Sequence, residues 1–178
     1  MQDNRERNLV DEAVGGDIES FGELCRRYYS PMVAIAYSLV GDHQLAEDAA
    51  QESFARALVN LRNLKDQTRF APWLAGICRN VAKDIVAAKS RQISTKDLRL
   101  AADQNDSEEN GMLIRRAIEQ LPTGARELIV LRYYDKLSYE QLASVLGVSR
   151  AAIRGRLARA KRKMARYLTH NGFPESKL

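Results

Sequence analysis

Residues 138–159, SYEQLASVLGVSRAAIRGRLAR, contain the pattern that decides the fold of the C-terminal part of the chain. Ser138 and Gln141 have the spacing of a capping box, which opens a short helix. Gly147 provides a residue that accepts a positive φ without a Cβ clash, as a tight turn requires. Ser149 then has the side chain of a helix N-cap. The stretch therefore predicts two helices joined by a short turn.

The small and apolar residues of the same stretch predict how these helices pack. Ala143 is small enough for two helix backbones to approach closely, and Gly147 follows four residues later. Ile153 comes six residues after the glycine and Leu157 one turn further, so both lie on the same side of the second helix. This spacing is typical of the helix-turn-helix motif, whose second helix reads DNA. We take Ala143, Gly147, Ile153 and Leu157 as its scaffold.

The second helix carries charge of one sign. Eight Lys or Arg and no acidic residue lie between Ser149 and Leu168. Residues 112–178 have a formal net charge of +9, whereas residues 1–90 and 91–111 have −2 each. A solvated helix usually mixes both signs, and a membrane-surface helix has a wider apolar face with Trp or Phe. The pattern favours DNA, with an anionic membrane or an acidic protein as alternative partners.

At about 100° per residue, the apolar residues of this helix form one stripe and the basic residues flank it or lie opposite. Arg150 and Arg154, in the first turns, are candidates for base edges, because Arg can bind guanine bidentately. Later basic residues such as Arg162 are expected at phosphates or solvent. The predicted DNA-binding residues are Ser149, Arg150, Ala151, Arg154, Arg156, Arg159 and Lys161.

The N-terminal half predicts a helical bundle. Apolar residues recur at helical spacing from Asp17 to Gly41, with a brief interruption expected at Pro31. Further helices are expected from about His43 and from about Ala71. The fold class is all-α, with two small helical domains joined by a flexible linker. The expected boundaries are an N-terminal bundle at 1–90, a linker at 91–111 and a helix-turn-helix domain at 112–178.

The chain lacks the motifs of an enzyme. No Ser-His-Asp order, phosphate-binding glycine loop or zinc motif is present, and His43 and His170 are isolated. We expect no catalytic residue, no metal and no cofactor. The polar N-terminus excludes a secretory signal, and no apolar stretch is long enough to span a bilayer. Cys25 and Cys78 are expected to be reduced and buried, so the prediction is a cytoplasmic protein without membrane insertion.

Four segments carry a resemblance to a known family. They are GDIESFGELCRRYY (16–29), GDHQLAEDAAQESFARAL (41–58), FAPWLAGICRNVAKD (70–84) and LPTGARELIVLRYYDKLSYEQLASVLGVSRAAIRGRLARAKRKM (121–164). In this order and spacing the chain resembles the bacterial extracytoplasmic-function sigma factors of RNA polymerase, over roughly residues 10–90 and 112–168. The resemblance implies a non-catalytic subunit that directs promoter recognition, strand opening and transcription initiation. The implied partners are core RNA polymerase, promoter DNA and an anti-sigma factor.

The resemblance also implies roles for individual residues. The last segment corresponds to the domain that binds the promoter −35 element. In the second segment, Asp48, Gln51, Glu52 and Arg56 correspond to the helix that docks on core polymerase. The residues that correspond to the −10 element interface are Asn63, Lys65, Gln67 and Arg69, with Arg79, Asn80 and Lys83 along the adjacent strand path. Spacing alone predicts Trp73 to be a core residue. The alternative function is a helix-turn-helix regulator that binds an operator as a dimer.

Overall fold

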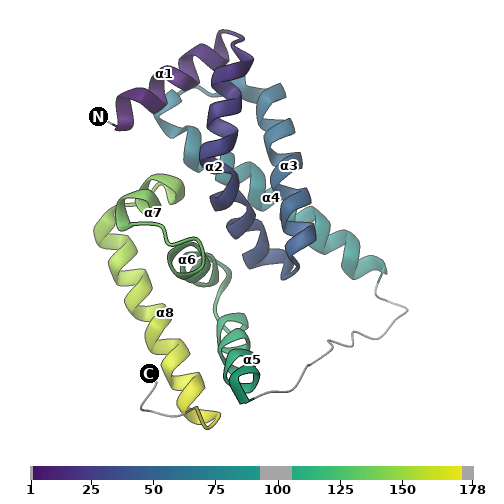
Figure 1. Cartoon of the computed structure of the whole chain (residues 1–178), viewed down its shortest axis with the longest axis vertical. Coiled ribbons are helices and arrows are strands. Elements are labelled where there is room, and N and C mark those ends of the chain that lie inside the picture. The colour runs from purple at the N-terminus through teal and green to yellow at the C-terminus, as the bar shows by residue number, and fades with distance from the viewer. Residues whose placement is uncertain (1, 93–105, 174–178) are drawn as a thin grey trace.

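The computed structural model describes residues 2–92 and 106–173, and within these ranges the secondary structure is helical. Two groups of helices lie against each other (Figure 1). The first group comprises α1 (Gln2–Val14), α2 (Ile18–Val40), α3 (His43–Asn60), the short 3₁₀ turns η1 (Leu61–Asn63) and η2 (Gln67–Arg69), and α4 (Phe70–Gln92). The second comprises α5 (Asp106–Glu119), α6 (Thr123–Tyr133), α7 (Tyr139–Leu146) and α8 (Arg150–His170). Among these helices, none is long and apolar enough to cross a membrane.

Side-chain caps set the ends of α2 and α3. Asp17 accepts a hydrogen bond from the backbone N–H of Glu19, and Asp42 accepts one from that of Leu45. Gly41, at a φ of 68°, closes α2 with the left-handed residue that commonly ends a helix. The expected helix between Asp17 and Gly41 is therefore confirmed.

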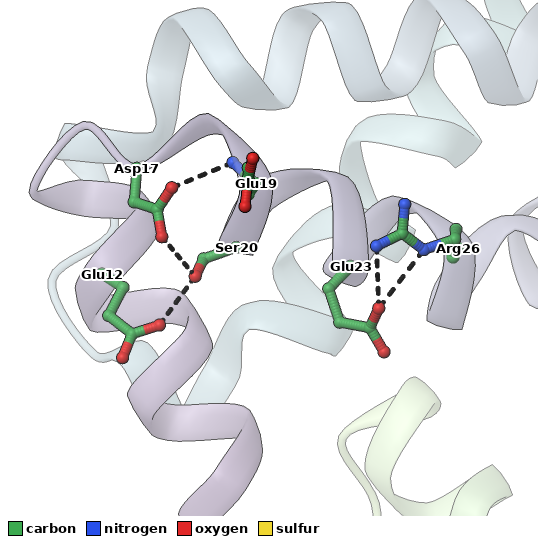
Figure 2. A network of polar contacts seen from close by, with 6 residues as sticks. All are labelled: Glu12, Asp17, Glu19, Ser20, Glu23 and Arg26. Carbon is green, nitrogen blue, oxygen red and sulfur yellow. Dashed lines mark hydrogen bonds and ion pairs between the residues drawn. The ribbon is translucent and has the colours of Figure 1, made fainter.

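Polar side chains also fix the corner between α1 and α2 (Figure 2). The Ser20 hydroxyl lies 2.6 Å from a carboxylate oxygen of Glu12 and 2.8 Å from one of Asp17. A hydroxyl has one proton, so Ser20 donates to one of these carboxylates at a time. The Ser20 hydrogen bond lowers the pKa of Asp17, which keeps the N-cap ionised. This corner holds α1 against the bundle.

Two expectations about the N-terminal half were wrong. Pro31 does not interrupt the helix, because α2 runs continuously from Ile18 to Val40. The lost backbone hydrogen bond is outweighed by packing, since Tyr28 and Met32 are buried on either side of the proline. Cys25 is only half-buried, whereas Cys78 is buried and its thiol donates to the backbone oxygen of Met32. Burial raises the pKa of the Cys78 thiol to about 11, so it stays protonated at neutral pH.

Part of the segment expected to be a linker is helical. α4 continues to Gln92 and α5 already begins at Asp106, so both ends of the 91–111 range are helical. Its central part, residues 93–105, lies outside the described residues. The polar sequence at these ends has no apolar periodicity, which is why it reads as a linker.

The two groups of helices share one hydrophobic core. Leu74 and Cys78 of α4 belong to the same buried cluster as Leu128 of α6 and Leu142 of α7. A smaller cluster of Ala117, Leu168 and Phe173 joins α5 to the end of α8. α2 contacts α6 and α4 contacts α7, so these four helices form the junction between the groups.

Candidate nucleic-acid interface

The predicted helix-turn-helix forms as the sequence indicates. The Ser138 hydroxyl accepts from the Gln141 backbone N–H at 3.2 Å, and the Gln141 side chain accepts from the Ser138 N–H at 2.8 Å. Gly147 has a φ of 66° and ends α7, and Ser149 caps α8 by accepting from the N–H of Ala152. The capping box, the turn and the second cap are all confirmed.

Three of the four scaffold residues are buried or half-buried, Gly147 is exposed in the turn, and the predicted DNA-binding residues are exposed. Ile153 and Leu157 are buried, and Ala143 is half-buried beside them. The seven predicted contact residues are all exposed along α8, from Ser149 to Lys161. α8 therefore offers a basic surface over an anchored apolar stripe, as a major-groove helix requires.

The two arginines proposed as base readers differ in their surroundings. Arg150 forms an exposed ion pair of 2.7 Å with Glu140 of α7. Arg154 has no hydrogen-bond or ion-pair partner among the residues that the structure describes. Lys161 lies over the ring of Tyr133 on α6, 5.2 Å from its centroid. Of the two arginines, only Arg150 is held by an ion pair within the described residues.

Replacing Gly147 with alanine is expected to destabilise the protein by about 2 kcal/mol or more, because a left-handed residue with a Cβ is strained. The added Cβ would also lie 3.1 Å from the Cβ of Pro72. Thermal unfolding of the purified variant measures the loss. Gly124→Ala is the control, because a Cβ added there would meet nothing within 4 Å and the φ of Gly124 is not positive. Equal stability of the Gly147 variant and the wild type would contradict this role.

A second candidate surface lies where α3, η1 and α4 meet. An open pocket of about 300 Å³ is lined by Arg56, Asn60, Asn63, Trp73, Ile77 and Asn80. Trp73 is half-buried and packs against Phe70, with the ring centroids 6.0 Å apart. The prediction that Trp73 is a core residue is therefore only partly right, because the helical spacing does not reveal that the residue borders a pocket.

The structure brings only some of the predicted −10 residues together. Asn63 and Asn80 line this pocket, and Lys65, Gln67 and Arg69 lie on the neighbouring η1–η2 segment outside it. Lys83 is exposed one turn further along α4. Arg79 is engaged elsewhere, because its guanidinium binds Glu127 of α6. Arg56, predicted for another surface, also lines the pocket.

The predicted polymerase-binding residues lie together on α3. Asp48, Gln51, Glu52 and Arg56 are exposed, whereas Ala49 and Phe54 are buried as expected. Arg56 contacts Glu52 at 2.7 Å and Asp84 of α4 at 3.6 Å. The hydrogen bond to Glu52 raises the pKa of Arg56. The face is a network of surface charges, accessible to a partner protein.

Family models match both halves of the chain. The model described as Sigma-70 region 2 matches residues 24–92, and the model described as Sigma-70 region 4 matches residues 111–164. Together these ranges cover more than half of the chain, in the order of the two groups of helices.

Curated relatives match across both ranges. The probable RNA polymerase sigma factor RfaY of Xanthomonas campestris is 34% identical over 164 residues, 85% of this chain but only 41% of the relative. The RNA polymerase sigma-H factor of Pseudomonas aeruginosa is 29% identical over 178 residues, 90% of this chain and 92% of the relative. The ECF RNA polymerase sigma-E factor of Salmonella typhimurium is 29% identical over 170 residues, which cover 86% of this chain and 88% of the relative.

Solved structures share the fold. CnrH, solved in complex with the cytosolic domain of CnrY, is 26% identical with a TM-score of 0.65, covering 94% of this chain and 99% of the solved chain. The sigma factor RpoE from Bartonella quintana, solved with the anti-sigma factor NepR, is 22% identical with a TM-score of 0.56. The match covers 85% of this chain and 98% of the solved chain.

Proposed function

This chain belongs to the sigma-70 family, in its extracytoplasmic-function group, and from that membership we propose how its surfaces divide the work of promoter recognition. It is an RNA polymerase sigma factor, which binds the core enzyme and directs promoter recognition, strand opening and initiation. The observation that carries this conclusion is the match of regions 2 and 4, in order, in one chain. The alternative of a dimeric operator-binding regulator is not favoured. Sigma factors are generally non-catalytic, and we expect no enzymatic activity from the chain alone.

Residues 112–178 are proposed to bind the −35 element through α8. Arg154 reads a base edge, Arg150 joins it once released from Glu140, and the basic residues further along α8 bind phosphates. A major-groove helix places its N-terminal residues at the bases and its later residues nearer the backbone. The exposure of the basic side chains and the absence of a described partner for Arg154 support this division.

Residues 1–90 are proposed to capture the −10 element as its strands separate. The pocket at Trp73 combines an aromatic surface with the side-chain amides of Asn63 and Asn80. An unstacked base binds such a site by stacking on the ring and by hydrogen bonds to the amides. Lys65, Gln67, Arg69 and Lys83, beside the pocket, are proposed to hold the strand's backbone. Residues 91–111 would connect the two DNA-binding parts, so that core polymerase fixes the distance between them.

The exposed polar face of α3, formed by Asp48, Gln51, Glu52 and Arg56, is proposed to dock on core polymerase. Exposed charges that already pair within the chain, such as Glu52 with Arg56, contribute little to stability and are available to a partner. The burial of Ala49 and Phe54 behind them keeps the face rigid.

Charge reversal of Asp48 and Glu52 to lysine is expected to reduce retention of the protein on immobilised core polymerase about tenfold or more, since each reversal replaces attraction by repulsion. A pull-down at physiological salt measures the retained fraction. Asp11→Lys with Glu119→Lys is the control, because these exposed acids lie on α1 and α5, away from the α3 face. Unchanged retention of the α3 variant would remove both residues from the interface.

Two further assignments follow from the same membership. The Bartonella quintana sigma factor was solved with an anti-sigma factor, and we propose that a protein of that class restrains this chain. Because core polymerase and promoter DNA lie in the cytoplasm, we propose that this chain acts there. Run-off transcription tests the function: the chain with core polymerase should give discrete transcripts that core polymerase alone does not give.

A further inference from the structure

A partly buried ion pair joins the two groups of helices. Arg79 of α4 donates from Nε to both carboxylate oxygens of Glu127, each at 3.1 Å, and from Nη2 to one of them at 2.7 Å. The side chain of Glu127 is 6% exposed and that of Arg79 is 28% exposed. The two residues are 48 positions apart, one in each sigma region matched by the chain. The pair therefore exists only while the two regions lie together.

Polar contacts on either side extend this junction. Arg126, next to Glu127, donates to the backbone oxygen of Ser38 near the end of α2 at 3.3 Å. Ser30 of α2 donates to a carboxylate oxygen of Asp135, whose pKa burial raises. The turn of the helix-turn-helix at Gly147 lies against Pro72, close enough that an added Cβ would crowd the proline ring. The regions thus contact each other at several polar points around a shared apolar core.

The junction between the two regions involves residues that are proposed to bind the −10 element. Arg79 is one of the residues predicted to contact the separated −10 strand. In the structure, however, its guanidinium binds the carboxylate of Glu127. Carboxylate and phosphate oxygens use the same planar donors of arginine, so Glu127 and a DNA phosphate compete for Arg79. The α7–α8 turn also lies close to this surface. A Cβ at Gly147 would lie 3.8 Å from the guanidinium of Arg69, another residue predicted to bind the −10 element.

We infer that Glu127 holds the free protein in a closed state by occupying Arg79 in place of a promoter phosphate, so that the −10 surface becomes available only when the two regions separate. The inference rests on the proposed −10 role of Arg79. It assigns to Glu127, a residue of the −35 half, an autoinhibitory role over the −10 half.

The chemistry of the contact suits a reversible latch. A buried ion pair contributes little net stability relative to apolar residues of the same size, because both charges lose hydration. When the regions separate, both charges regain water, whereas two apolar surfaces in their place would be left exposed. An ion pair at this position therefore makes closing specific. Opening then exposes the shared apolar core but no further apolar side chains at positions 79 and 127.

Glu127→Gln is the direct test, because it keeps the shape and removes the charge. In small-angle scattering of the full chain, the variant should have a larger radius of gyration than the wild type. In fluorescence anisotropy without polymerase, it should bind a short single-stranded DNA carrying the non-template −10 sequence of a transcribed promoter about fivefold more tightly or better, because a larger fraction is open. Glu119→Gln, an exposed acid on α5, is the control for charge and should behave as wild type.

A charge swap separates the latch from a loss of folding. Arg79→Glu alone and Glu127→Arg alone should both open the protein, and the double variant should restore the compact radius of gyration. The double variant should also bind the single-stranded DNA at most as tightly as wild type, since residue 79 is then acidic. No expansion in any single variant, or expansion without tighter DNA binding by Glu127→Gln, would overturn the inference. Failure of the wild type to support core-dependent transcription would instead overturn the proposed function, so the two failures are distinguishable.

Discussion

Replacing Arg154 with alanine is expected to reduce run-off transcription about tenfold from promoters whose −35 element presents a guanine to this side chain, since a bidentate arginine–guanine contact is worth about 1–3 kcal/mol. Arg154 is exposed in the second turn of α8, one residue after the buried anchor Ile153. Promoters with a different base at that position should lose much less. The measurement is run-off transcription over a set of promoters that differ by single −35 substitutions.

Arg162→Ala provides the matched control. It removes the same charge from an exposed position two turns further along α8, where a phosphate contact is expected. This variant should weaken transcription uniformly across −35 sequences and reduce the salt dependence of DNA binding by about one charge. If Arg154→Ala also causes an equal loss at every −35 sequence, Arg154 is not a base reader.

Replacing Asn80 with alanine is expected to reduce strand opening at the −10 element about tenfold, with less effect on closed promoter binding. Asn80 is exposed and lines the pocket beside Trp73, and its amide is proposed to hydrogen-bond the edge of a captured base. A pocket that recognises a base by such a bond loses roughly 1–3 kcal/mol when the bond is removed. Permanganate reactivity of unpaired thymines in the polymerase–promoter complex measures the open fraction.

Asn8→Ala is the control for this second variant. Asn8 is exposed on α1 and does not line the pocket, so its replacement should leave strand opening unchanged. A normal permanganate pattern in the Asn80 variant would remove this residue from base capture and would leave the pocket without one of its two proposed amide donors.

Local chemistry made much of the fold predictable. Asp17, Ser138 and Ser149 each have a side chain that satisfies a free backbone N–H at a helix start, and each caps a helix in the structure. Gly147 is one of four glycines with a positive φ among the described residues, and its place after an apolar run identified the turn. These features depend on neighbours within a few residues, so the sequence reveals them directly.

Features that depend on tertiary packing were missed. α1 has few apolar positions, with Val10 and Ala13 buried, and a helix with so weak a stripe is stabilised by contact with α2 rather than by its own pattern. Pro31 looked like a break because its cost is local, whereas the packing that outweighs it comes from other helices. The pattern of apolar residues in the sequence therefore underestimated the extent of α1 and α2.

The candidate site was predicted unevenly for the same reason. The residues of α8 were correctly separated into buried and exposed sets, because a helix imposes a regular period. The pairing of Arg79 with Glu127 crosses 48 residues, and no local pattern indicates it. The pocket at Trp73 likewise combines side chains from α3, η1 and α4. The sequence shows only that Glu127 is the single acidic residue of α6 and precedes the apolar run 128–131. A buried carboxylate at that position would need a cationic partner, but the sequence does not say which one.

Run-off transcription with core polymerase on a genomic promoter library tests the central claim most directly. The account predicts discrete transcripts that appear only when both the chain and core polymerase are present, from promoters that share a −35 and a −10 element. It also predicts that the chain without polymerase binds these promoters weakly. Tight binding of a dimer to a palindromic site, with no start sites that depend on core polymerase, would contradict the account.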